Sequence, residues 1–135
     1  MTTVDVEPQQ LLIGGSWVGA ESGKTFEKTN AYTGDVATTA AAAGREDARR
    51  AVDAAYAASE AWANSAPAER RGLLNRAADL LLERQEDIAA TVTEETGATF
   101  GWGMFNCMLA SGMLREAAAQ TYSLIGEVIP SDVPG

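Results

Sequence analysis

The fold is decided by residues 93–135, which read TEETGATFGWGMFNCMLASGMLREAAAQTYSLIGEVIPSDVPG. We interpret this stretch as the end of one helix, a long helix from about Gly101 to Tyr122, and the start of a strand at 126–135. The long helix is apolar on most of its sides, through Trp102, Met104, Phe105, Met108, Leu109, Met113 and Leu114. Such a helix is normally buried in a larger body or lines a cavity. Because a strand also needs a partner, we expect the chain to be the front of a larger protein.

The N-terminal third has the pattern of small β-structure. Short apolar runs at 11–13 and 16–18 flank Gly14–Gly15, a pair that can adopt the positive φ angles of a tight hairpin turn. Two further extended stretches are expected at 25–28 and 36–40. We therefore predict small β-hairpins before the first helix.

Three helices are predicted after these hairpins. From Glu46 to Trp62, apolar residues recur at three- and four-residue spacing, which is typical of one helix face. A second helix is predicted to begin at Pro67 and to end at Gly97, which suits a left-handed terminating residue. The third is the long apolar helix, in which Gly112 costs about 1 kcal/mol of helix propensity that close packing could offset. The predicted fold class is therefore α/β, with small hairpins followed by three helices.

The composition excludes several classes of function. A chain of 135 residues can form one domain, and its 46% hydrophobic residues argue against disorder. The net charge of −9 would repel phosphate backbones and anionic membrane surfaces, so we expect no nucleic-acid and no membrane partner. We see no signal-peptide pattern and no apolar run of membrane-spanning length, so we expect a cytoplasmic protein. The absence of histidine removes the commonest general base and metal ligand.

Few side chains could carry chemistry. Cys107 is the only cysteine, and its apolar neighbours would disfavour a thiolate, so we interpret it as a structural buried cysteine. The adjacent pair Glu94–Glu95 points in different directions on a helix and is not expected to share a proton.

One side of the long helix holds Trp102, Asn106 and Leu109, at positions i, i+4 and i+7. Core packing is the default interpretation of such a stripe, and a buried asparagine within it would indicate a cavity. The chain alone contains no catalytic constellation.

Taken in order from Leu11, these segments resemble the N-terminal portion of the aldehyde dehydrogenase superfamily. The resemblance covers nearly the whole chain and comprises LLIGGSWV, KTFEKTNAYTGDV, EDARRAVDAAYAASEAW, PAERRGLLNRAADLLLERQEDIA, EETGA and GMLREAAAQTYSLIGEVIPSDVPG. The segments GWGMFNCMLASGMLREAA and GEVIPSDVPG look most like the branch that oxidises aromatic aldehydes such as salicylaldehyde, vanillin or benzaldehyde. The resemblance is carried by the collinear order of the segments rather than by any one signature motif.

The resemblance implies an NAD(P)-dependent oxidation of an aldehyde to its carboxylic acid, by a cysteine nucleophile and a glutamate base. It places both groups and the cofactor loop outside this chain, and Cys107 does not match the family's nucleophile. We therefore predict no catalytic and no cofactor-binding residue here. Residues 1–125 would form the N-terminal part of the NAD(P)-binding domain, truncated before the main cofactor-binding sheet. Residues 126–135 would begin the strand that bridges subunits in homodimers and tetramers.

The resemblance also implies two sets of site residues. The third helix lines the substrate tunnel in the family, so Trp102, Asn106 and Leu109 are the predicted substrate-binding residues, with Trp102 stacking on an aromatic aldehyde. Many members hold a monovalent cation through the acidic residue before the Thr-Gly pair and backbone near the second strand. That position corresponds to Glu95 together with Thr29, in the region of Lys28 and Thr29.

Two functional hypotheses follow. In the first, the chain is an N-terminal fragment of an aromatic-aldehyde dehydrogenase and is inactive alone. In the second, it is a non-catalytic, stand-alone binding or oligomerisation module that uses the apolar face of its third helix for a partner. The first is favoured by the collinear match to the family.

Overall fold

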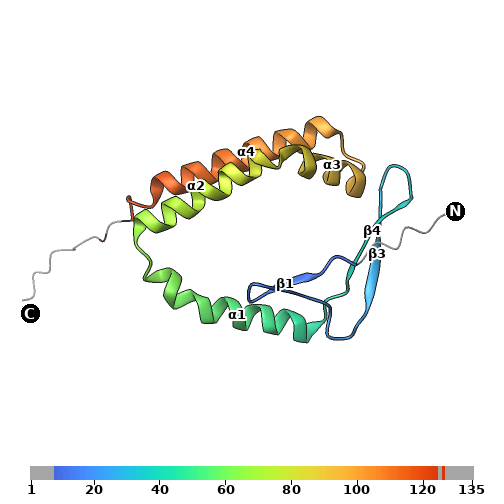
Figure 1. Cartoon of the computed structure of the whole chain (residues 1–135), viewed down its shortest axis with the longest axis horizontal. Helices are drawn as coiled ribbons and strands as arrows, with labels where there is room; N and C mark the ends of the chain where they lie inside the picture. The colour runs from blue at the N-terminus through green and yellow to red at the C-terminus, as the bar shows by residue number, and fades with distance from the viewer. Residues whose placement is uncertain (1–7, 125, 127–135) are drawn as a thin grey trace, which may run out of the picture.

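The structure is a computed structural model that describes residues 8–124 and 126. Two antiparallel strand pairs precede four helices in the described part of the chain. Their bounds are β1 Leu11–Ile13, β2 Ser16–Val18, β3 Thr25–Thr29, β4 Val36–Ala41, α1 Arg45–Ala63, α2 Pro67–Glu83, α3 Gln85–Thr96 and α4 Phe100–Gln120. Figure 1 shows these elements as an open arch. Helices α2, α3 and α4 form one side, α1 and the first hairpin form the other, and the β3–β4 hairpin closes one end.

Both hairpins form as predicted. Strands β1 and β2 pair with Leu12 opposite Trp17, and Gly14 and Gly15 between them have φ angles of 60° and 80°. These positive φ angles are those of a tight hairpin turn, and they are unfavourable for an L-residue that has a side chain. Strands β3 and β4 pair through a longer turn that begins at Asn30, whose side-chain oxygen accepts the backbone N–H of Tyr32 at 2.8 Å.

Helices α2, α3 and α4 pack against one another through small residues. Gly103 and Ser111, two turns apart on one face of α4, are both buried. A Cβ placed on Gly103 would lie 2.6 Å from the Cα of Ala89 in α3, and the hydroxyl of Ser111 donates to the carbonyl of Ala78 in α2 at 3.1 Å. These small side chains allow the helix backbones to approach closely.

The predicted second helix is two helices, so the prediction of three helices is wrong in number. The backbone leaves helical geometry at Arg84, with φ −109° and ψ 13°, and this residue ends α2 and precedes α3. One straight helix from Pro67 to Thr96 would be about 45 Å long at 1.5 Å per residue. Helix α4, with 21 residues, would be only about 31 Å long. The break therefore lets both α2 and α3 lie along α4.

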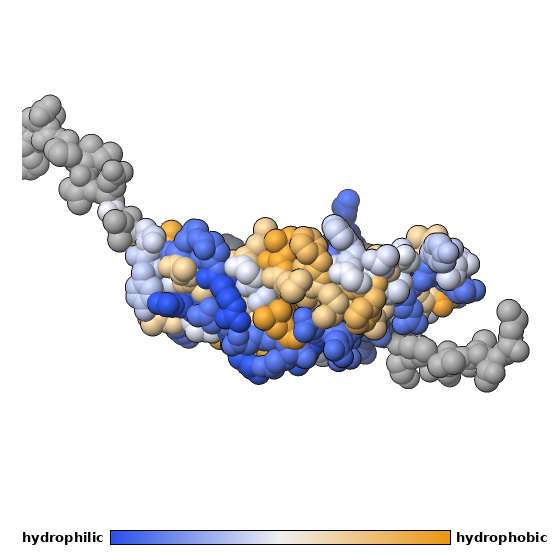
Figure 2. Space-filling view, turned by 90° about the horizontal axis from the view of Figure 1, so that it is seen from above, coloured by the Kyte–Doolittle hydropathy of each residue, from blue (hydrophilic) through white to orange (hydrophobic). Residues whose placement is uncertain are grey.

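The apolar face predicted for α1 is exposed. Val52, Tyr56 and Trp62 all lie in solvent, with Tyr56 at 81% exposure, and α1 touches the rest of the described chain mainly at the first hairpin. No large side chain among the described residues is fully buried. Seen from above the helical side, apolar residues gather in the middle of the surface (Figure 2). The small core leaves much apolar helix surface available for other protein.

Candidate functional site

The start of α4 is fixed by a side-chain cap. The hydroxyl of Thr99 accepts the backbone N–H of Trp102 at 3.3 Å, and the helix begins at Phe100. A capping hydroxyl satisfies one of the N–H groups that the first helical turn leaves without a partner. This cap sets where the first turn of α4, and with it Trp102, lies.

The three predicted substrate-binding residues lie along one exposed face of α4. Trp102 is 56% exposed, Leu109 is 48% exposed, and Asn106 between them is half-buried. The side-chain amide of Asn106 donates to the carbonyl of Trp102 at 2.9 Å, so it is partnered within its own helix and requires no cavity. Their role in substrate binding stays a prediction.

Phe105 joins this face and was not among the residues predicted for the site. Its ring centroid lies 5.4 Å from that of Trp102, with an interplanar angle of 30°, so the two rings form one aromatic surface. Phe105 could have been found from the sequence, because it follows Trp102 by three positions and residues three apart on a helix are neighbours. We refer to Trp102, Phe105, Asn106 and Leu109 as the α4 face.

The opposite face of α4 holds Cys107. It is 3% exposed and follows Gly103 by one turn, on the face that packs against α2 and α3. The thiol therefore points away from the α4 face, in the position expected of a structural cysteine.

Among the described residues, no group of three or more histidine, cysteine, aspartate or glutamate side chains is placed to hold a metal ion.

The second predicted site, at Thr29 and Glu95, lies where the β3–β4 hairpin meets the end of α3. The ammonium of Lys28 donates to a carboxylate oxygen of Glu95 at 2.7 Å. The side-chain amide of Asn30 donates to the carbonyl of Glu94 at 2.6 Å, while the side chain of Thr29 is exposed. The structure therefore brings Glu95 together with Lys28, and the cation site stays a prediction.

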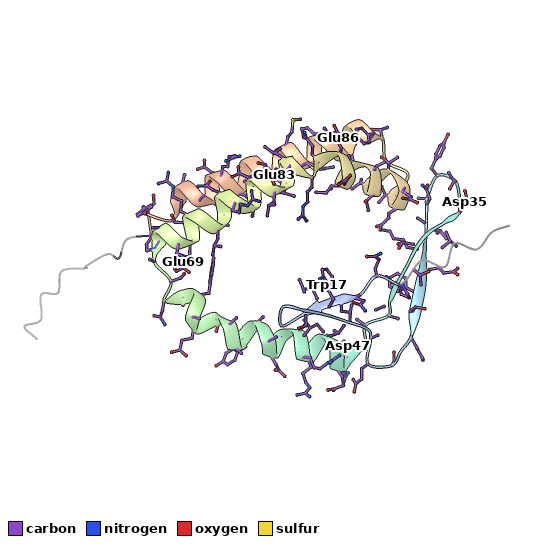
Figure 3. The ribbon with its side chains drawn as sticks, viewed as in Figure 1. Trp17, Asp35, Asp47, Glu69, Glu83 and Glu86 are labelled. Carbon is purple, nitrogen blue, oxygen red and sulfur yellow. The ribbon has the colours of Figure 1, made fainter. Side chains whose placement is uncertain are left out.

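A buried carboxylate, that of Asp47, lies at the start of α1. Asp47 is 2% exposed and accepts the backbone N–H groups of Gly44 at 2.8 Å and Glu21 at 3.1 Å. The guanidinium of Arg50 donates to it at 2.6 Å. In Figure 3, Asp47 lies at the beginning of α1, and Trp17 of the first hairpin points away from that helix. Asp47 thus joins the loop after β2 to α1.

These bonds lower the pKa of Asp47 from its ordinary value, chiefly through the Gly44 N–H and then through Arg50, while burial acts in the opposite direction. A lowered folded-state pKa gives stability that is present above the unfolded pKa of about 3.9 and is lost as the pH falls through the folded value. We expect Asp47→Asn to be less stable than the wild type at neutral pH. This deficit should shrink as the pH falls below about 4.

The measurement is thermal unfolding of both proteins by circular dichroism across this pH range. Asp53→Asn is the matched control, because Asp53 lies on the same helix and is 65% exposed. The control should show little deficit at any pH. A deficit of Asp47→Asn that is constant down to pH 2 would contradict the assignment.

The geometry of the fold matches known enzymes. A model of the aldehyde dehydrogenase family matches residues 17–135. The solved NAD-dependent benzaldehyde dehydrogenase from Corynebacterium glutamicum superposes with a TM-score of 0.90 at 31% identity, over 99% of this chain and 29% of that one. The solved salicylaldehyde dehydrogenase from Pseudomonas putida G7 gives 0.85 at 30% identity, over 93% and 26%. The chain belongs to the aldehyde dehydrogenase family.

Curated relatives agree with this assignment. The vanillin dehydrogenase of Pseudomonas sp. (strain HR199) is 53% identical over 125 residues, which are 93% of this chain and 26% of that protein. The salicylaldehyde dehydrogenase of Pseudomonas putida is 33% identical over 123 residues, or 91% and 26%. The predicted resemblance to family members that act on aromatic aldehydes is confirmed. The chain spans about a quarter of the length of these relatives.

Two further findings concern the described residues. Their α/β architecture of small hairpins and helices is that of the N-terminal part of the aldehyde dehydrogenase fold, as predicted. None of the helices in this part of the chain combines the length and apolar character needed to cross a membrane. The predicted bridging strand at 126–135 lies outside the described residues apart from Gly126.

Proposed function

We propose that this chain is the N-terminal part of an enzyme that oxidises an aromatic aldehyde to its carboxylic acid with NAD or NADP as the oxidant. The observation that carries the proposal is the 53% identity with a vanillin dehydrogenase over 93% of the chain. In this proposal residues 1–125 belong to the NAD(P)-binding domain and 126–135 begin the bridging strand of a homodimer or tetramer. We place the enzyme in the cytoplasm.

The catalytic and cofactor-binding groups are assigned to other parts of the enzyme. The chain has no histidine, and its single cysteine is buried in the helix interface. We find no GxGxxG or P-loop pattern in the sequence, so the residues present do not form a phosphate-binding loop for a dinucleotide. The exposed apolar faces of α1 and α4 support the same proposal, because surfaces of this size normally contact other protein.

Within this enzyme, the α4 face would contact the aldehyde substrate. Trp102 and Phe105 offer two adjacent rings, which suit an aromatic aldehyde by offset stacking. Leu109 continues the apolar surface two turns along the helix, and the polar group of Asn106 is already bonded to its own helix. The face would therefore select the apolar ring of the substrate rather than its aldehyde group.

The test is a chimera in which the matching 125 residues of the vanillin dehydrogenase are replaced by those of this chain. We expect the chimera to oxidise vanillin with NAD or NADP and the 135-residue chain alone to show no turnover. The unmodified vanillin dehydrogenase is the positive control. Turnover by the purified chain alone, or a folded chimera without activity, would overturn the proposal.

The role of Trp102 is tested in the same chimera. We expect Trp102→Ala to lower kcat/KM for vanillin by roughly two- to tenfold, because an aromatic pair contributes about 0.5–1.5 kcal/mol beyond its buried area. An aliphatic aldehyde should be affected less, because it offers no ring to stack. Trp102→Phe keeps a ring and is the matched control, with a smaller loss expected. Equal losses for the aromatic and the aliphatic aldehyde would contradict a stacking role.

The stand-alone binding module remains the second candidate, because the exposed α4 face would also suit a partner chain. Native mass measurement of the 135-residue chain separates the two. A defined, monodisperse oligomer supports the module. A monomeric or aggregating chain that binds a dye for exposed apolar surface supports the N-terminal part of a larger enzyme.

A further inference from the structure

Negative charge gathers at the end of α3, where the helix meets the β3–β4 hairpin. The last turn of α3 contains Glu94 and Glu95 and no basic residue. A helix C-terminus already has the negative end of the helix dipole, where anions are unfavourable and cations are stabilising. This end of the helix therefore needs a positive group, and α3 does not supply one in its own last turn.

The hairpin supplies the positive group. Lys28 and Asn30 are two positions apart, at the end of β3, and both are half-buried against α3. The Lys28 ammonium lies 2.7 Å from Oε2 of Glu95, with the two side chains 41% and 28% exposed. The Asn30 amide donates to the carbonyls of Thr93 at 3.3 Å and Glu94 at 2.6 Å. Protein donors therefore bond both the carboxylate and the carbonyl oxygens of this helix end.

A monovalent cation would need these same oxygens. An ion bound at the Glu95 carboxylate would lie close to the Lys28 ammonium, which carries the same charge, and would compete with the Asn30 amide for the carbonyls. The side chain of Thr29 is exposed, unlike those of Lys28 and Asn30 on either side of it. The residues present therefore do not fit a bound K⁺ or Na⁺.

We propose that the ammonium group of Lys28, rather than a bound K⁺ or Na⁺, is the cation that neutralises Glu95 and the C-terminal end of α3. The ion pair then joins the hairpin to the helical side of the arch without any added ion. Local order at this end of α3 is consequently independent of which monovalent cation is in solution.

The chain offers a matched control for this proposal. It contains two lysines, Lys24 and Lys28, separated by four positions. Lys24 is exposed and, among the residues that the structure describes, forms no ion pair. Replacing either lysine by methionine removes one positive charge and keeps a long side chain, and only Lys28→Met also removes the contact with Glu95.

The experiment measures amide hydrogen exchange of the whole 135-residue chain in KCl, NaCl and tetramethylammonium chloride at equal ionic strength. The exchange is followed in the digestion peptide that covers residues 93–97. The local readout does not require a sharp global transition, and it is independent of aldehyde oxidation. We expect the wild type and Lys24→Met to exchange equally in all three salts. Lys28→Met should exchange about two- to fivefold faster than either in tetramethylammonium, as loss of a half-exposed ion pair implies.

Two results would overturn the proposal. Slower exchange of the wild type in KCl or NaCl than in tetramethylammonium would show that an ion binds beside the lysine. Exchange of Lys28→Met at the wild-type rate in tetramethylammonium would show that this helix end needs no cation from the hairpin.

Discussion

Replacing Gly103 by alanine is expected to destabilise the protein by up to about 2 kcal/mol, although alanine is the better helix former. A Cβ at this position would lie 2.6 Å from the Cα, 2.8 Å from the Cβ and 3.2 Å from the carbonyl oxygen of Ala89. Two of these atoms belong to the α3 backbone, so the clash is relieved only by moving α3 and α4 apart. Overpacking of this kind costs about 1–3 kcal/mol and outweighs a propensity gain of about 1 kcal/mol.

Gly112 provides the control for this prediction, because it lies in the same helix and is exposed. Outside its own helix, no atom lies within 4 Å of the position that a Cβ would occupy there. Gly112→Ala should therefore stabilise the protein by roughly 0.5–1 kcal/mol. Urea unfolding followed by circular dichroism measures both variants against the wild type. If the two substitutions shift the free energy of unfolding in the same direction, the close approach of α3 and α4 is not as described.

Replacing Gly97 by alanine is expected to cost about 2–4 kcal/mol, through two effects that add. The residue ends α3 with φ +74°, a left-handed conformation that costs an L-residue about 1–2 kcal/mol. Its Cβ would also lie 2.7 Å from the Cβ of Tyr32 and 3.0 Å from the backbone nitrogen of Tyr32. The substitution should therefore separate the β3–β4 hairpin from α3 as well as strain the helix end.

The matched control is Gly34→Ala, in the turn of the same hairpin. Gly34 has φ +79° and open space around its Cβ position, so its substitution carries the conformational cost without the clash. We expect a loss of only about 1–2 kcal/mol, again from urea unfolding. Equal losses at Gly34 and Gly97 would show that the contact with Tyr32 contributes nothing.

The sequence predicted those parts of the fold that local chemistry determines. The paired glycines Gly14–Gly15, the first-turn proline Pro67 and the terminating Gly97 all occupy the positions expected of them. Each acts through its own backbone or through the nearest few residues, so no knowledge of distant packing was required. The family, too, was identified correctly, because the order of such local segments is preserved along the chain.

The predictions that failed depend on residues distant in the chain. Nothing near Arg84 breaks a helix, since its neighbours are good helix formers, and the break follows from packing on α4. The closely packed glycine is Gly103 and not Gly112, because Ala89 lies opposite only the former. On the α4 face, whose role in substrate binding stays a prediction, the second ring of Phe105 was missed, and so was the ion pair between Lys28 and Glu95. Such pairings require the relative positions of two elements, which periodicity does not give.

The closure of the arch by the β3–β4 hairpin has a consequence for the order of folding. The bond between Lys28 and Glu95 joins residues 67 positions apart, whereas the bond between Ser111 and Ala78 joins residues 33 positions apart. Doubling a loop raises the entropy cost of closing it by about 0.6 kcal/mol, so the more local contact forms at the lower cost. Helices α2 and α4 can therefore associate first, and the N-terminal hairpin joins a scaffold that already exists.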